Sequence, residues 1–288
     1  AGPTSDLRNK PDMVAPGTNI STADVNWQST GSLVRNWSGT SFSAPLAAGM
    51  GAQLIDYGRA HDLSTDQRVL RAVMINSAQP VLDSNGAPWS ATPQFPLDNQ
   101  QGSGALDAVA TAHQYMAGQY VPGAVPNTGW ALHDIVGAST ATTTPESYTL
   151  NLSPTVGSYI DLTLVWDEHV VWTDRGTIGV IDPADSFSVS PTNPQDNLNL
   201  YLFRNGVLVA SSVSNTDTVE HIHFLVDQPG SYSISVSRAA AVDPGETYAL
   251  AWRSTPEPAT LTLAAIGLIG LSLFARRQKR HGAISRCA

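Results

Sequence analysis

Two different hydrophobic periods divide the chain. In the first part, residues 46–55 are almost all apolar and small, and residues 69–78 are mostly apolar. A segment that is apolar on every side is typical of a buried helix. We therefore expect buried helices over 41–57 and 64–78, and a short alanine-rich helix over 107–117. Ser64 is the expected cap of the second helix, and Gly58 the left-handed end of the first.

Beyond residue 129, apolar and polar residues alternate. This period of two is typical of half-buried strands, and seven or eight short strands at this spacing predict an antiparallel sandwich or jelly roll. Asn205-Gly206 signals a hairpin turn, and Pro229-Gly230 and Pro244-Gly245 mark two more. The alternation is found at residues 148–152, 160–164, 198–202, 222–224, 232–236 and 248–252.

Loops and tails complete the expected organisation. The polar segment 79–104 predicts a long surface loop, and the Pro- and Gly-rich segment 119–129 predicts a linker. Residues 259–275 form an uncharged, mostly apolar run that is followed by Arg276, Arg277, Lys279 and Arg280. Such a run predicts a transmembrane helix with the body facing outward. The predicted domains are therefore 1–118, 130–254 and a tail over 255–288.

Composition narrows the function classes. The net charge is −9, and the basic residues of the tail make the body still more acidic. Nucleic acids bind basic faces, so we expect no nucleic-acid partner. The one cysteine, Cys287, lies in the tail, so the body can hold no disulfide.

A hydroxyl stands at the start of the first predicted helix. Residues 39–45 read Gly-Thr-Ser-Phe-Ser-Ala-Pro. The first turn of a helix has free N–H groups and a field that favours an anion. A serine nucleophile needs such a place, because attack on a carbonyl leaves a negative oxygen. Ser41 is therefore the candidate nucleophile.

Four blocks of sequence carry a family resemblance. Residues 39–45 with Ala48-Gly49 resemble the serine motif of the subtilisin-like serine peptidases. Residues 10–17, 70–78 and 102–108 resemble flanking segments of that family in the same order. The resemblance implies part of a doubly wound α/β peptidase domain, with residue 1 deep inside a larger domain. It also implies that Ser41 is acylated, that Gly39, Thr40 and Phe42 border the substrate, and that proteins or peptides are the substrates.

The later segments carry two further resemblances. Residues 164–167, 196–200 and 230–234 resemble the β-sandwich that follows the peptidase domain in some of these enzymes. Pro256-Glu257-Pro258, the apolar run and the basic cluster together resemble the PEP-CTERM sorting signal of exported proteins in bacteria with an outer membrane. That resemblance implies transient anchoring in the inner membrane, cutting near the motif by a transpeptidase-like enzyme, and release to the envelope or matrix. The alternative is a plain C-terminal anchor.

The catalytic partners of a serine are missing from the expected blocks. A serine hydroxyl needs a histidine base and a carboxylate that orients it. Every histidine follows Ser41, and neither Asp6 nor Asp12 sits in the family's aspartate motif. The base, the acid and the oxyanion asparagine are therefore expected upstream of residue 1. Two alternatives stay open: a non-catalytic envelope protein with a degenerate peptidase fold, and a fragment that is inactive as supplied.

Other polar residues have plainer interpretations. We expect His61 at the surface, and His221 and His223 on one solvated strand face rather than at a metal. The resemblance implies no required cofactor, although family members often bind structural calcium. Trp166 and Trp172 are expected to be core or edge aromatics. Oxygen ligands for calcium could come from Asp182, Asp185, Asp196, Asn197 and Asn199.

Overall fold

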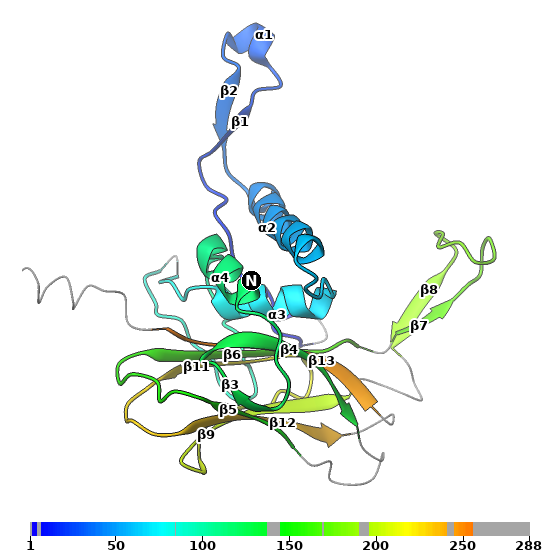
Figure 1. The fold of residues 1–288 in the computed structure, drawn as a ribbon. Helices are drawn as coiled ribbons and strands as arrows, with labels where there is room; N and C mark the ends of the chain where they lie inside the picture. Colours follow the sequence, from blue (N-terminus) through cyan, green and yellow to red (C-terminus); the bar gives the residue numbers. More distant parts are fainter. Residues whose placement is uncertain are drawn as a thin grey trace, which may run out of the picture.

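The fold has a mixed α/β part followed by a two-sheet β-sandwich (Figure 1). It was obtained as a computed structural model, which describes residues 2–4, 7–83, 85–136, 145–168, 170–189, 196–240 and 245–255. The elements of the first part are β1 (Ile20–Ala23), α1 (Trp27–Thr30), β2 (Val34–Trp37), α2 (Thr40–Ala60), α3 (Gln67–Ser77) and α4 (Ala108–Met116).

The second part is built of antiparallel strands, as their alternation predicts, except for β3, which pairs in parallel with β5. Its strands are β3 (Gly123–Val125), β4 (Thr128–Val136), β5 (Glu146–Leu150), β6 (Tyr159–Val165), β9 (Asn197–Arg204), β10 (Val207–Ser212), β11 (Val219–Leu225), β12 (Tyr232–Ala240) and β13 (Gly245–Thr255). One sheet has the order β10-β9-β12-β5-β3, and the other has the order β11-β6-β13-β4. Apolar side chains from the two inner faces form one core.

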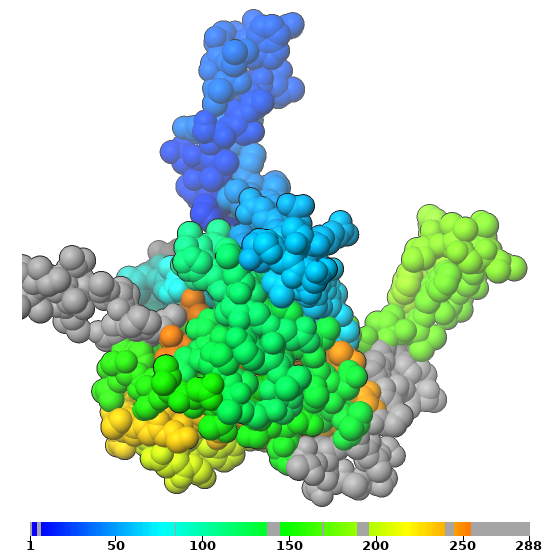
Figure 2. Space-filling model, in the orientation of Figure 1, coloured from blue at the N-terminus to red at the C-terminus, as the bar shows by residue number. Residues whose placement is uncertain are grey.

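Two hairpins project from this body (Figures 1 and 2). One is the pair β1–β2 with α1 at its tip. The other is the pair β7 (Val170–Thr173) and β8 (Ser186–Val189), which forms a separate two-stranded sheet. Both extend away from the sandwich on the side where α2 lies.

Several turns and caps differ from the expectations. Asn205 and Gly206 do form the β9–β10 hairpin, with φ of 50° and 79°. Pro229-Gly230 joins β11 to β12, and β12 is followed by β13, but in each case the two strands lie in different sheets. The predicted hairpins at Pro229-Gly230 and Pro244-Gly245 are therefore wrong, because a period of two does not reveal which sheet a strand joins.

The helix ends also need correction. Asp66, not Ser64, caps α3: its carboxylate accepts a hydrogen bond from the Arg68 N–H. Gly58 does not end α2, which continues to Ala60. A Cβ at Gly58 would overlap the Tyr115 hydroxyl, so the glycine allows α2 and α4 to approach closely. Asp107 caps α4 at the predicted place.

The two parts share a second core. α3 lies on the outer face of the sheet β11-β6-β13-β4 and contacts β13 and β6. Its side chains are buried with residues of α2, α4 and the sheet, including Leu54, Tyr115, Trp130, Val165 and Ala251. The segment 119–129, expected to be a linker, contains β3, which pairs in parallel with β5.

The predicted membrane segment lies outside the described residues. The run 259–275 belongs to residues 256–288, of which the structure gives no description. Within the described ranges, no helix is both long and apolar enough to cross a bilayer.

Candidate active site

The entry to α2 is anchored to an extended segment that runs past it. The Gly39 N–H donates to the Gly17 carbonyl at 2.7 Å, and the Phe42 N–H donates to the Gly39 carbonyl at 3.1 Å. A Cβ at Gly17 would overlap Ser43 Oγ and lie 2.9 Å from the Gly39 oxygen. The absence of a side chain at Gly17 therefore lets the two segments touch where the helix begins.

Ser41 lies in the first turn of α2, as predicted. Its side chain is exposed, and among the described residues its hydroxyl makes no hydrogen bond. The Thr40 and Ser41 N–H groups at the start of this turn have no partners within the helix. The hydroxyl is thus free to react and stands at the positive end of a 21-residue helix.

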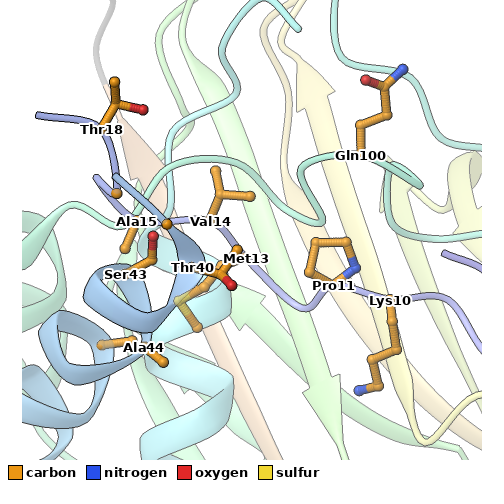
Figure 3. Close-up of a pocket in the computed structure, with 13 residues that line it drawn as sticks. Lys10, Pro11, Met13, Val14, Ala15, Thr18, Thr40, Ser43, Ala44 and Gln100 are labelled. Atoms are coloured by element: carbon orange, nitrogen blue, oxygen red, sulfur yellow. The ribbon is translucent and has the colours of Figure 1, made fainter. Parts of the chain in front are cut away.

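A groove of about 710 Å³ opens beside this turn (Figure 3). One wall comes from the segment 10–18, and the other comes from the first turns of α2, with the Ser43 hydroxyl pointing toward residues 15–18. Most lining side chains are apolar or small. Of the predicted substrate-binding residues, Gly39 and Thr40 line the groove and Phe42 does not; the predicted nucleophile Ser41 is also absent from the lining.

The wall of the groove is held by a partly buried ion-pair cluster. Asp12 accepts from Lys10 Nζ at 2.6 Å and from Arg71 Nε of α3 at 3.1 Å. Burial acts against ionisation, but the charges of Arg71 and Lys10 outweigh it and lower the pKa of Asp12. Val14 continues the wall by pairing with residues 104 and 106 through backbone hydrogen bonds. The cluster therefore fixes the segment that contacts Gly39.

The exposure of α2 corrects the expectation of a buried helix. Within α2 only Met50, Leu54 and Gly58 are buried. Those three residues pack against α3 and α4, while Ala48, Gly49 and Ala52 on other sides of the helix are exposed among the described residues. A uniformly apolar composition predicts that a helix is suited to burial, but it does not supply the elements that cover it.

No described residue supplies a base to Ser41. His61 lies at the far end of α2, about 30 Å away along the helix axis. It is exposed and stacks on Tyr57, with ring centroids 4.1 Å apart, which confirms its prediction as a surface residue. The candidate site in this part of the chain therefore consists of a nucleophile, backbone donors and one groove wall.

His221 and His223 are not solvated, contrary to expectation. His221 is buried, and its Nδ1 lies 2.8 Å from Thr163 Oγ1. His223 Nδ1 lies 2.5 Å from Asp161 Oδ1. The Trp89 ring from the loop 79–104 covers both imidazoles edge-on. A loop distant in sequence buries them, so alternation within β11 could not reveal it.

The three carboxylates considered for calcium are engaged elsewhere, whereas Asn197 Oδ1 and Asn199 Oδ1 are buried without a hydrogen-bond partner among the described residues. Asp182 accepts from the Thr177 and Ala184 N–H groups, and Asp185 accepts from the Arg175 N–H. Asp196 is buried and paired with Arg238. In the described ranges no three His, Cys, Asp or Glu side chains gather as a metal site requires. Structural calcium stays a prediction without a site among these residues.

Both tryptophans are placed as aromatics of the core or edge. Trp166 is fully buried, and its Nε1 donates to the Asp196 carbonyl at 2.8 Å. Trp172 is partly exposed on the edge strand β7.

Two supporting features were missed by sequence reasoning. The resemblance pointed to residues 10–17 as a block, but it did not single out Gly17 as the contact with α2. The pairing of Asp12 with Arg71 spans 59 positions, so no local pattern signals it. The Lys-Pro-Asp order of residues 10–12 was the available hint.

Two family models match parts of the chain. Residues 1–104 match the model of the subtilase family, and residues 254–280 match the PEP-CTERM protein-sorting motif. A search of the curated proteins gave no match. Among solved structures, the chain is similar to the pre-peptidase C-terminal domain of collagenase from Bacillus anthracis. That similarity has 13% identity and a TM-score of 0.26, and it covers 46% of this chain and 92% of that one.

The match at residues 1–104 contains Ser41, the groove and the segment that anchors α2. Residues 1–104 are therefore similar to the subtilase family, and a PEP-CTERM protein-sorting motif follows the β-rich part.

Proposed function

We propose that the chain is the nucleophile-bearing part of an exported serine endopeptidase that forms an acyl-enzyme on Ser41. The observation that carries the proposal is the exposed, unbonded hydroxyl of Ser41 in the first turn of α2, beside a groove, within the subtilase match. Ser41 Oγ attacks the peptide carbonyl and the amine leaves with a proton. Water then hydrolyses the ester and frees the hydroxyl.

The backbone of α2 supports the charged intermediate. The Ser41 N–H and its neighbours in the first turn lie at the positive end of the helix, where an oxyanion is stabilised. Gly39 has no side chain to keep a substrate backbone away, and Thr40 contributes to the groove wall. Phe42 borders the leaving-group side. A histidine base, its carboxylate and an asparagine oxyanion donor come from residues outside the chain as given, within a doubly wound peptidase fold.

The tail belongs to the same proposal. The PEP-CTERM motif at 254–280 indicates export sorting. We place the cut near Pro256-Glu257-Pro258, after a stage in which 259–275 anchors the protein in the inner membrane. The body then reaches the envelope or matrix of a bacterium with an outer membrane, where it acts on proteins or peptides.

The test is hydrolysis of an internally quenched peptide library by the product of the complete gene. Ser41→Ala should lower the rate by a factor on the order of 10⁶, because the covalent route is lost. Ser29→Ala, an exposed serine of α1, is the matched control and should leave the rate unchanged. Residues 1–288 alone should hydrolyse nothing. Equal rates for Ser41→Ala and the parent would leave the non-catalytic envelope protein as the better account.

A further inference from the structure

A hairpin arm formed by residues 170–189 projects from the sandwich (Figures 1 and 2). This arm has no role in the proposed reaction. β7 and β8 pair only with each other among the described strands. Their outer edges therefore offer unpaired backbone N–H and C=O groups. An isolated two-stranded hairpin is marginally stable in water, and a third strand with an apolar face stabilises it.

The register gives the arm one apolar face. Trp172 lies opposite Phe187, and Val170 is two residues before Trp172. Opposite residues and residues two apart share a face. Trp172 is 41% exposed, Phe187 is 57% exposed and Val170 is 53% exposed. The other face carries Val171 with hydroxyl residues. The arm is thus an amphipathic ribbon whose apolar face is uncovered.

Three carboxylates hold the tip in one conformation. Asp174 accepts from the Gly179 N–H, Asp182 from Thr177 and Ala184, and Asp185 from Arg175 and from Trp172 Nε1. The tip presents Ile178, which is 93% exposed, together with Val180 and Ile181. An apolar tip that is already ordered loses little conformational entropy on binding.

The arm is also acidic. Hydrogen bonds from backbone N–H groups lower the pKa of Asp182 and Asp185, so both stay ionised at neutral pH. Arg175 is the one basic side chain among the described residues 170–189. The arm therefore attracts cationic partners and is repelled by anionic lipid headgroups.

We propose that the hairpin arm docks extended polypeptide segments that carry apolar and basic side chains. The segment adds a third strand to an edge of the β7–β8 pair, and its apolar residues cover Trp172 and Phe187. The arm rises on the side of the sandwich where α2 lies (Figure 1). If the chain is a peptidase as proposed above, the docked polypeptide is its substrate, captured away from Ser41.

Binding tests the inference without requiring hydrolysis. The probe is a fluorescent twelve-residue peptide of alternating Val and Lys, titrated with residues 1–288 and followed by fluorescence anisotropy. A Val/Glu peptide of equal length and a Val/Lys peptide N-methylated at alternate residues are the comparison ligands. We expect the Val/Lys peptide to bind at least about tenfold more tightly than either, since charge and strand pairing both contribute.

Two substitutions on the arm separate recognition from loss of folding. Phe187→Thr removes the more exposed of the two aromatic side chains on the uncovered face and should weaken binding about tenfold. Val171→Thr alters the opposite face of the same hairpin and should leave binding unchanged. Equal affinity of the parent and Phe187→Thr overturns the inference, as does equal loss in both variants. Binding to phosphatidylglycerol vesicles that Phe187→Thr abolishes would assign the arm to a lipid surface and also overturns it; comparing the two variants cancels any insertion of residues 259–275.

The Ser41→Ala variant keeps the two proposals distinct. It should bind the Val/Lys peptide as the parent does. Binding with no Ser41-dependent hydrolysis defeats the proposed function and leaves the docking arm intact. If the enzyme hydrolyses long Val/Lys substrates and Phe187→Thr leaves that rate unchanged, the docking role of the arm is wrong and the proposed function stands.

Discussion

At the scale of single residues, the candidate site depends on the close contact between Gly17 and the start of α2. Gly17 touches Ser43 and Gly39 there, and no larger residue fits without displacement. Gly17→Ala should lower the free energy of unfolding by about 1–3 kcal/mol, because a new methyl group overpacks the contact. Urea denaturation followed by circular dichroism measures it.

A glycine elsewhere in the same region is the control. A Cβ at Gly49 meets nothing within 4 Å, and Gly49 lies inside α2. Gly49→Ala should therefore raise stability by about 0.5–1 kcal/mol through helix propensity. If both alanine variants shift stability in the same direction, the close contact at Gly17 is not what constrains that position.

The buried imidazole of His221 makes a pH prediction. Burial lowers its pKa to about 4, and the positive charges of His223 and Arg253 act in the same direction against the carboxylate of Asp161. The unfolded chain takes up this proton near pH 6.5, before the folded chain does. His221 thus favours the folded state above pH 6.5, and this contribution is lost as pH falls toward 4.

The measurement compares the parent with His221→Asn across that range. The free energy of unfolding of the parent should fall by up to about 3 kcal/mol more than that of the variant between pH 6.5 and 4. The difference between the two proteins isolates His221 from buried carboxyls such as Glu220, whose pKa is raised by burial. If the free energies of unfolding of the two proteins change in parallel with pH, His221 is not desolvated in solution.

Residue-scale prediction from the sequence worked where a local pattern carried the chemistry. The serine motif placed Ser41 in the first turn of its helix, and Asp107 was placed at the start of α4. The pattern could not predict the burial of His221, because the covering Trp89 lies 132 positions away in an irregular loop. Contacts of that kind have no periodic signal.

At the scale of elements, α3 is the piece that joins the two parts. Eight of its eleven residues are buried, from Val69 to Ser77, because α2 and α4 cover one side and the sheet covers the other. Ile75→Ala should cost about 2–5 kcal/mol by leaving a cavity. Val109→Ala, at an exposed position of α4, is the control and should change the free energy of unfolding by less than about 0.5 kcal/mol. Thermal unfolding followed by calorimetry distinguishes the two.

The tail is an element with its own prediction. The PEP-CTERM motif at 254–280 is proposed to direct sorting. Deleting residues 256–288 removes the proposed membrane anchor, so the body should not be retained in the membrane fraction or sorted to the envelope. Glu257→Ala should leave the full-length form in the membrane fraction, because the processing site is altered. Cell fractionation with mass measurement of the mature end checks both. Normal processing of Glu257→Ala would exclude a cut that depends on this motif.

Strands and helices were largely predictable, but their partners were not. The alternation over 148–252 located β5, β6, β9, β11, β12 and β13, since one side of each strand faces a core. It did not reveal β7 and β8, whose apolar side chains are exposed. Nor did the uniform apolarity of α2 reveal that the described chain covers only one of its sides.

At the scale of the whole molecule, the two parts should unfold together. Side chains of α2, α3 and α4 share a core with Trp130, Val165 and Ala251 of the sandwich. Asn76 of α3 also accepts a hydrogen bond from the Thr163 hydroxyl inside this interface. We expect one calorimetric transition for α3, α4 and the sandwich, with equal calorimetric and van't Hoff enthalpies. Two separate transitions would contradict a shared core.

The packing of the segment 119–129 could not be predicted from the sequence. Proline and glycine there were interpreted as a linker, yet the Tyr120 N–H donates a backbone hydrogen bond to the Trp130 carbonyl and β3 joins a sheet. Composition identifies where a chain turns, but not whether the two sides remain apart. The interface is formed by residues far apart in sequence, and only their packing reveals it.

The central claim is that Ser41 is the nucleophile of a serine peptidase. The most direct measurement is mass-spectrometric location of a fluorophosphonate adduct after treating the product of the complete gene. We predict a single adduct on the peptide containing Ser41, absent from Ser41→Ala and from heat-unfolded protein. No adduct, or an adduct on another serine that persists in Ser41→Ala, would contradict the account.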